Sequence, residues 1–227
     1  MSSPPLHRPP SPLLRHLGRG LLLLALGLGF VSATQAEEVR RVEQSYFAGD
    51  AERVKVRLTF GSLEVIGTTD RDAQVELIID CRREDLDKCR RRAERIRLQP
   101  RISRGTLHLN LKNTPRGQAQ GLGATMKVRI PRHLGLEIDV SGGDVSVHGM
   151  TSHLEIDTGG GDIEATFPQD QVEYVKIDVG FGSADLWTKD GNRIEGSGFP
   201  KSITWRGTGT ARVEVDLGGG EAEIRLQ

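Results

Sequence analysis

The chain has 227 residues, with 28 glycines, 31 basic and 31 acidic side chains, and aromatic residues make up only 4% of it. So few aromatic rings exclude a thick core filled by large side chains, and glycine without a three-residue period excludes collagen. The apolar residues alternate with polar ones over most of the chain, which excludes a disordered protein and favours short β-strands separated by tight turns.

Residues 1–36 are typical of a secretory signal peptide. They hold three arginines and no acidic residue, and the apolar run 21–31 is followed by small residues at Thr34 and Ala36. A membrane-spanning helix needs about 20 apolar residues, so this run is short for one. We expect cleavage after Ala36 and a mature protein that is periplasmic, secreted or on the cell surface and not integral to a membrane. The alternative is an uncleaved N-terminal anchor.

The mature chain divides into two parts of opposite charge. Residues 37–132 carry 21 basic and 14 acidic side chains, a net charge of +7, and residues 133–227 carry 7 basic and 17 acidic side chains, a net charge of −10. This dipolar distribution predicts head-to-tail self-association or an anionic partner for the basic part. The alternative is an ordinary solvated surface.

The first part, residues 37–132, is predicted to hold loosely patterned strands of the β domain and one short charged helix. Strands are expected at 54–58, 62–66, 73–79, 102–111 and 126–130. The helix is expected at about 84–96, where apolar residues recur at helical spacing. It is predicted to cover an end or a side of the strand stack. Its apolar stripe consists of Leu86, Cys89, Ala93 and Ile96.

Six arginines in or beside this helix are candidates for binding an anionic partner, such as lipid headgroups or acidic glycans. They are Arg82, Arg83, Arg90, Arg91, Arg92 and Arg95. Nucleic acid is excluded as a partner, because no aromatic residues interleave with the arginines and export removes the chain from it. The alternative is a solubilising face.

The two cysteines, Cys81 and Cys89, are predicted to form a disulfide, because an exported chain meets an oxidising compartment. Within one continuous helix their Cα atoms would be about 12 Å apart, beyond disulfide reach. If they pair, Cys81 must therefore lie outside the helix, near the end of the strand 75–80. The alternatives are two buried thiols or a metal site, and no accompanying histidine supports the latter.

Four segments of the second part, residues 133–227, align without gaps: 136–149, 154–167, 175–188 and 213–226. Each has an alternating strand, a glycine-rich turn and a second alternating strand. Stacked copies would bury a continuous ladder of Ile138, Ile156, Ile177 and Val215. The spacing predicts a further, degenerate copy near 194–206, between the last two. The pattern favours a β-solenoid, or a stack of short strands like a β-helix, and a β-sandwich is the alternative.

Acidic residues recur at equivalent outward positions on both sides of these turns, and they are candidate ligands for Ca²⁺, which prefers six to eight oxygen atoms. These residues are Asp139, Asp144, Asp157, Asp162, Asp178, Asp216 and Glu221. No other cofactor is indicated. The alternative is a solvated acidic face that protects the sheet from edge pairing.

One aromatic residue, Trp187, is predicted to point outward, at the position equivalent to His148. It could stack on a sugar or on a partner protein, and the alternative is that it covers a weak copy of the repeat. The four histidines of the mature chain have no organised serine or cysteine partner, so we expect no enzyme.

The stretches RGTLHLNL and KVRIPRHLGLEIDVSGGDV, followed by repeated GGD turns, resemble the bacterial DUF4097 putative-adhesin family of β-solenoid domains. The resemblance covers about residues 50–227, although this chain has Gly-Gly where the family more often has Asn-Gly. It implies a solenoid of the bacterial envelope or surface and no reaction. We therefore expect an exported, non-enzymatic β-solenoid that presents a binding or scaffolding surface to an envelope protein, a lipid or a glycan. The alternative is an adhesion module that binds Ca²⁺ or glycans.

Overall fold

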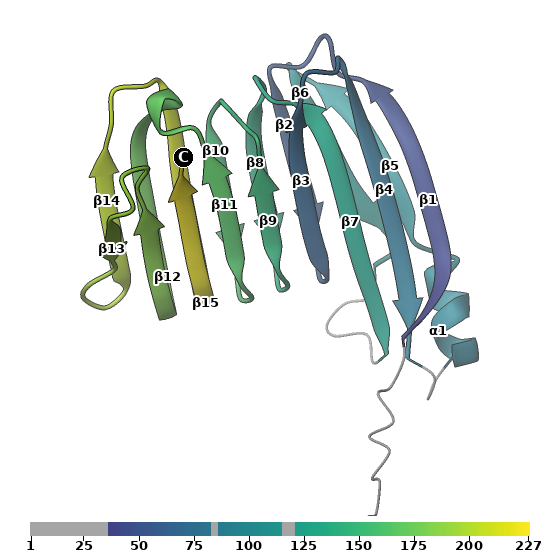
Figure 1. Cartoon of the computed structure of the whole chain (residues 1–227). Coiled ribbons are helices and arrows are strands. Elements are labelled where there is room, and N and C mark those ends of the chain that lie inside the picture. Colours follow the sequence, from purple (N-terminus) through teal and green to yellow (C-terminus); the bar gives the residue numbers. More distant parts are fainter. Residues whose placement is uncertain (1–35, 83–85, 115–120) are drawn as a thin grey trace, which may run out of the picture. The chain divides into compact units, whose positions relative to one another are not determined.

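The computed structural model describes residues 36–82, 86–114 and 121–227, which belong to one compact unit (Figure 1). The predicted signal peptide, apart from Ala36, lies outside the described residues. Besides a short 3₁₀ turn, Gln169–Gln171, there is one helix, α1, Leu86–Ala93, in the described part of the chain. The strands are β1 Glu37–Phe47, β2 Arg53–Leu58, β3 Ser62–Thr68, β4 Asp72–Cys81, β5 Arg97–Ser103, β6 Thr106–Lys112, β7 Leu122–Pro131, β8 Gly135–Val140, β9 Val145–His148, β10 Leu154–Thr158, β11 Ile163–Phe167, β12 Val172–Trp187, β13 Arg193–Glu195, β14 Lys201–Arg206 and β15 Ala211–Leu226.

The strands form one curled, open sheet in the order β1-β4-β7-β3-β9-β11-β15-β10-β8-β2-β6-β5, with β12 beside β15 and with β13 and β14 beside β12. The sheet turns back on itself at β15, which pairs with β10 through its first half and with β11 through its second half. We call β1, β4, β7, β3, β9 and β11 the first arm, and β5, β6, β2, β8 and β10 the second arm. The predicted mainly β fold with one short helix is confirmed.

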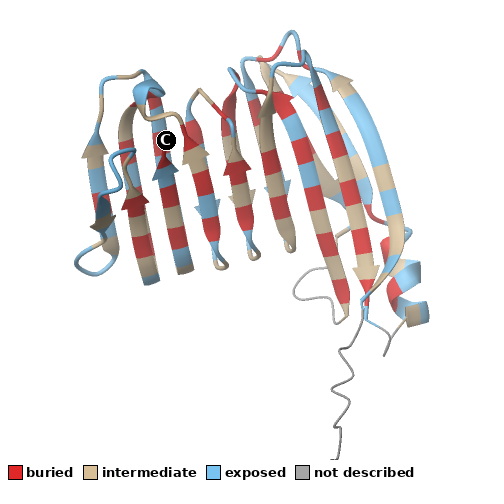
Figure 2. Ribbon diagram, viewed as in Figure 1, coloured by how far each residue is buried: buried red, intermediate tan, exposed pale blue. Residues whose placement is uncertain are grey.

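The core lies on the inward face of both arms, whose buried side chains belong to a single hydrophobic cluster. Buried and exposed residues alternate along the strands, as Figure 2 shows. The predicted apolar ladder is present, because Ile156 pairs with Ile138 on one side and with Val215 on the other, and Val215 pairs with Ile177. These four side chains are at most 3% exposed. Aliphatic residues stacked at strand spacing thus replace the missing aromatic rings.

The order of the repeats differs from the prediction. The last repeat, 213–226, lies between 154–167 and 175–188, and not beyond a degenerate copy. Residues 194–206 instead form parts of β13 and β14, which pair antiparallel with β12 on its far side. The chain therefore skips one place in the sheet after β11 and fills that place only with β15. The sheet therefore does not consist of coils that follow one another in the order of the chain.

Glycines at the turns are required by both conformation and space. Gly143, Gly161, Gly182 and Gly220 have φ of 134°, 122°, 129° and 136°, where other residues are strained. A Cβ atom on any of them would lie 1.8–2.3 Å from a backbone carbonyl oxygen of the adjacent turn. The turns of neighbouring repeats can stack only because these side chains are missing.

The helix α1 packs against β4 and β1 and is shorter than the predicted 84–96, of which residues 84 and 85 lie outside the described part. Cys89, Ala93 and Ile96 are each 1% exposed, so the predicted stripe faces the core. Arg40, beside a bulge in β1, donates hydrogen bonds to the carbonyl oxygens of Ala93 and Ile96 at 2.8 and 2.6 Å. These bonds attach β1 to the end of the helix, where the Ala93 carbonyl oxygen also accepts the backbone N–H of Ile96 at 3.2 Å.

A disulfide joins Cys81 to Cys89, with the two Cα atoms 6.0 Å apart. Cys81 is the last residue of β4 and lies outside the helix, in the position that pairing required. Both residues are buried. No helix in the described residues is long and apolar enough to cross a bilayer.

Candidate functional site

The candidate site is the outer face of the second arm together with the first half of β15. Three strands there, β8, β10 and β15, each place one glutamate and one aspartate outward, because the residues between them point into the core. Register pairing brings the glutamates into one row and the aspartates into another. We call this set the acidic block; its members are Glu137, Asp139, Glu155, Asp157, Glu214 and Asp216.

Basic residues of β2 border the acidic block. Lys55 pairs with Glu137, and Arg57 Nε lies 2.9 Å from Asp139 Oδ2. The Lys55 and Glu137 side chains are only 17% and 25% exposed, so this pair is partly shielded from water. In the part of the chain that the structure describes, the four acids on β10 and β15 form no salt bridge. The acids of β8 are therefore paired with basic residues of β2, whereas those of β10 and β15 have no such partner among the described residues.

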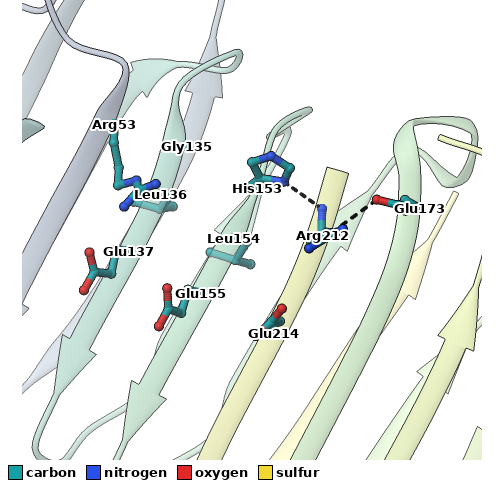
Figure 3. A pocket seen from close by; sticks show the side chains of 10 residues that line it. All are labelled: Arg53, Gly135, Leu136, Glu137, His153, Leu154, Glu155, Glu173, Arg212 and Glu214. Carbon is teal, nitrogen blue, oxygen red and sulfur yellow. Dashed lines mark hydrogen bonds and ion pairs between the residues drawn. The ribbon is translucent and has the colours of Figure 1, made fainter. Parts of the chain in front are cut away.

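A shallow pocket of about 370 Å³ opens on this face (Figure 3). Gly135, which has no side chain, lies beside Arg53 in its lining. The buried residues Leu136 and Leu154 line the pocket, together with the row of glutamates. Its full lining comprises Arg53, Gly135, Leu136, Glu137, His153, Leu154, Glu155, Glu173, Arg212 and Glu214.

Hydrogen bonds hold the far wall of this pocket. The backbone N–H of Arg212 donates to Nδ1 of His153 at 3.0 Å, and Arg212 Nε donates to Glu173 Oε2 at 3.2 Å. In this arrangement His153 Nδ1 carries no proton. Arg53, on the opposite wall, forms no salt bridge with any described residue. Two guanidinium groups and several carboxylates thus share one hollow, an arrangement that suits reversible binding of charged groups.

The acids that follow the turns have structural partners. The backbone N–H of Asp162 donates to Asp144 Oδ1 at 3.2 Å, and the N–H of Glu221 donates to Asp162 Oδ1 at 3.0 Å. Each carboxylate therefore ties its turn to the next one in the stack. These oxygens are partly used before any metal is considered.

The predicted metal ligands before the turns lie side by side in the order Asp139, Asp157, Asp216 and Asp178. At the end of the row, Lys176 Nζ lies 2.7 Å from Asp178 Oδ2. Its hydrogen bond, and then one from Ser202, lower the pKa of the Asp178 carboxyl below the ordinary value. Among the described residues, no three His, Cys, Asp or Glu side chains are grouped closely enough to hold a metal ion.

The arginines predicted to bind an anionic partner lie on and beside α1, away from the acidic block. Arg82, Arg90, Arg91 and Arg95 are exposed and Arg92 is half-buried, whereas Arg83 lies outside the described residues. Arg90 Nη2 is 2.5 Å from Glu37 Oε1, so one of the charges is neutralised within the chain. The other four described arginines are not gathered into a pocket with the residues of the candidate site.

The predicted stacking residue Trp187 is half-buried and already has cationic neighbours. The guanidinium carbons of Arg193 and Arg225 lie 5.6 and 5.8 Å from the centroid of its ring, within the range of cation–π attraction. Its indole nitrogen is buried and has no hydrogen-bond partner among the described residues. A sugar that stacked on this ring would compete with the arginine side chains.

Sequence reasoning did not single out the basic residues that border the acidic block. Arg53, Lys55 and Arg57 occupy alternate positions of β2, separated by the buried Val54 and Val56. The alternation itself is the signal that would have found them, because it places all three on one outward face. It does not reveal which strand lies beside them.

No family model matches this chain, and no curated protein matches it. Solved structures similar to it include a "putative cell adhesion protein" from Clostridium sporogenes, with a TM-score of 0.46 and 14% identity over 83% of this chain and 100% of that one. A "putative adhesin" from Bacteroides fragilis follows with a TM-score of 0.26, 10% identity and coverage of 82% and 97%. A "putative lipid binding protein" from Parabacteroides distasonis has a TM-score of 0.23, 8% identity and coverage of 82% and 94%. These TM-scores lie below 0.5, and no functional conclusion is drawn from them.

Proposed function

We propose that the chain is an exported protein of the bacterial cell envelope that binds a partner through the outer face of its second arm and catalyses no reaction. The observation that carries this proposal is the register of the charges on that face. Six carboxylates of the acidic block and the basic residues of β2 stand in rows across neighbouring strands. Buried residues on either side fix each strand, so the spacing of the charges is set before a partner arrives, which lowers the cost of ordering them.

Export is supported by two features. The pattern of residues 1–36 is that of a signal peptide, and the Cys81–Cys89 disulfide is of a kind that persists in oxidising compartments. The in-register stacking of the four repeats supports the description of their part of the sheet as a short β-solenoid. The bacterial origin and membership of the DUF4097 family rest on the sequence resemblance alone.

Cell fractionation tests export. The full chain, expressed with its own leader in a bacterium, is expected in the envelope fraction with Glu37 as its first residue and with both cysteines unreactive toward a thiol label. A protein that keeps Met1 and stays in the cytoplasm with free thiols would contradict export.

Site-directed photocross-linking in the intact envelope tests the binding face. A photoreactive residue in place of Asp157 is expected to give an adduct. The matched control is Glu164, which is equally outward and exposed on the first arm, in the same repeat. Adducts from both positions, or from neither, would contradict binding through the second arm.

The second candidate function is adhesion through Ca²⁺ or a glycan, and it is favoured by the acids of β10 and β15 that form no salt bridge among the described residues. Calorimetry with CaCl₂ distinguishes it. Heat and a higher melting temperature that both disappear in the double substitution Asp157→Asn and Asp216→Asn would support a calcium site. No heat at millimolar Ca²⁺ would dispose of it.

A further inference from the structure

We propose that the partner of this face is a second copy of the same chain, which binds face to face about a two-fold axis parallel to the strands. This inference rests on the proposed function, because it uses the same outer face. It is carried by one row of charges that crosses that face, in which three basic residues adjoin three acidic residues.

The half of the face opposite the acidic block is basic. The strands β5, β6 and β2 contain no acidic residue, and basic side chains share their outward positions with neutral ones such as Gln99 and Asn110. We call this set the basic block; its members are Arg53, Lys55, Arg57, Arg97, Arg101, His108 and Lys112. The strands β8 and β10, in turn, contain no basic residue. Three basic strands therefore adjoin three that carry the acidic block.

The two blocks share one complete row. In one row, Arg101 pairs with His108 and His108 with Lys55, and the row crosses into the acidic block at Glu137. The row continues through Glu155 and Glu214. The sign of the charge thus reverses between β2 and β8, with three basic residues on one side and three acidic residues on the other. Beyond Glu214 the row continues on β12 with Lys176.

A two-fold axis that runs above the boundary between β2 and β8 places the basic block of one copy over the acidic block of the other. Rotation about an axis parallel to β2 and β8 sets β2 of one copy over β8 of the other, β6 over β10, and β5 over β15, and it keeps every row opposite itself. His108 then faces Glu155 of the second copy, and Arg101 faces Glu214 of the second copy. Each contact occurs twice, as in any two-fold interface.

The same geometry disfavours an unrelated polyion. A polyanion that lies along the basic block meets the acidic block on the same face, and a polycation meets the basic block. Only a surface with the same reversal is complementary over both halves, and this chain supplies one. Like charges placed opposite each other suppress incorrect partners, which is how electrostatics provides specificity.

The association is expected to be weak and to depend on salt. The pairs would be polar and partly exposed, and exposed charges are screened beyond about 10 Å at 0.1 M salt. Sedimentation equilibrium on the exported protein measures the dissociation constant. We expect this constant to rise by a factor of roughly ten or more between about 50 mM and about 500 mM NaCl. A protein that is monomeric at low salt up to about millimolar concentration, or an association that salt does not weaken, would overturn the inference.

Charge reversal provides the sharper test. The variant Arg101→Glu/His108→Glu makes the basic block acidic, and the variant Glu155→Lys/Glu214→Lys makes the acidic block basic. Each is expected to be monomeric alone, because equal charges then face each other. An equimolar mixture of the two is expected to recover the dimer, because opposite charges are again paired at all four positions.

A matched control separates this interface from a change in net charge. Glu164→Lys/Glu223→Lys makes the same change in net charge as the basic variant, on β11 of the first arm and on the second half of β15 beside it. It is expected to dimerise like the wild type, and melting curves check that every variant is folded. If the control also becomes monomeric, or the mixture does not associate, the face pairing is wrong.

The outcomes separate this inference from the proposed function. A monomeric chain that still cross-links through Asp157 to a different envelope molecule would overturn self-pairing and leave the binding face in place. A chain that gives no adduct in the envelope and does not associate in solution would overturn both.

Discussion

At the scale of single residues, the turns depend on glycines, because a side chain at these positions would clash with the backbone of the adjacent turn. Gly161 has φ of 122°, and a Cβ atom there would lie 2.3 Å from the carbonyl oxygen of Gly143. The backbones of the two adjacent turns would have to move apart to relieve this contact, because it involves no flexible side chain that could move instead. The close stacking of adjacent turns therefore constrains the sequence more tightly than the core does.

Gly161→Ala is expected to lower the free energy of unfolding by about 2 to 4 kcal/mol, because backbone strain and a steric clash act together. Urea denaturation measures the change. The control is Gly191→Ala, where φ is 81° but nothing lies within 4 Å, so that only the conformational strain remains. Equal losses at the two positions would show that stacking of the turns is not the cause.

Asp178 makes stability depend on pH. Lys176 and then Ser202 lower the pKa of its carboxyl in the folded protein. As the pH falls, the unfolded chain therefore takes up a proton at Asp178 before the folded one does, and the contribution present above an ordinary aspartate pKa of about 3.9 is lost.

Asp178→Asn is accordingly expected to be less stable than the wild type at neutral pH and to lose less stability between about pH 5 and pH 2. Urea midpoints measured across this range check the slope. Asp157→Asn is the control for the loss of a carboxylate in the same row, because that carboxylate forms no salt bridge with a described residue. Parallel curves for wild type and Asp178→Asn would contradict the assignment.

At the scale of elements, the helix depends on two long-range attachments. The disulfide fixes α1 to the end of β4, and Arg40 of β1 bonds to the carbonyl groups at its C-terminal end. An isolated helix of eight residues is unstable in water, so packing and these attachments hold it.

The double substitution Cys81→Ser/Cys89→Ser is expected to lower the free energy of unfolding by about 2 to 3 kcal/mol, the value for closing a short loop. Chemical denaturation with and without a reductant measures it. Reductant should destabilise the wild type by the same amount and leave the variant unchanged, and hydrogen exchange should rise first in α1. An unchanged midpoint in reduced wild type would contradict the prediction.

Element types were predictable from the sequence, but their neighbours were not. Alternation in segments such as 154–158 and 213–217 identifies the strands and the residues that face the core. Repeat similarity also predicts that Ile156 and Val215 stack, because equivalent positions must share a ladder. It does not order the copies, since any copy presents the same edge to any other. That is why the sequence predicts the last repeat beyond residues 194–206, whereas β15 lies between the repeats 154–167 and 175–188.

The outward direction of the site residues was predictable from the sequence, and their role as ligands stays a prediction. The outward acids follow from alternation, and the structure places them outward. Their role as calcium ligands was inferred from spacing along the chain, whereas the Asp144 and Asp162 carboxylates accept backbone N–H groups across turns. The boundary between Lys55 and Glu137 could not be foreseen either, because it depends on β2 lying beside β8.

At the scale of the whole molecule, the last strand occupies a central place. β15 pairs with β10 and β11 on one side and with β12 on the other. Its inward residues, which include Val213, Val215 and Ile224, are at most 3% exposed. Removal of this strand would leave two long edges and a gap in the core.

A chain truncated after Thr210 is therefore expected to lose its cooperative unfolding transition in the repeat region. Hydrogen exchange should show β10, β11 and β12 without protection. Addition of a synthetic peptide of residues 211–227 is expected to restore protection, because it can fill the vacant place. A truncated chain that melts like the full-length protein would contradict the central role of β15.

The place of β15 also sets the order of events during synthesis. β15 follows β11 and β12 along the chain, so during synthesis both strands leave the ribosome before the strand that separates them in the sheet. The repeats 154–167 and 175–188 can therefore complete their pairing only after residues 211–226 have been synthesised.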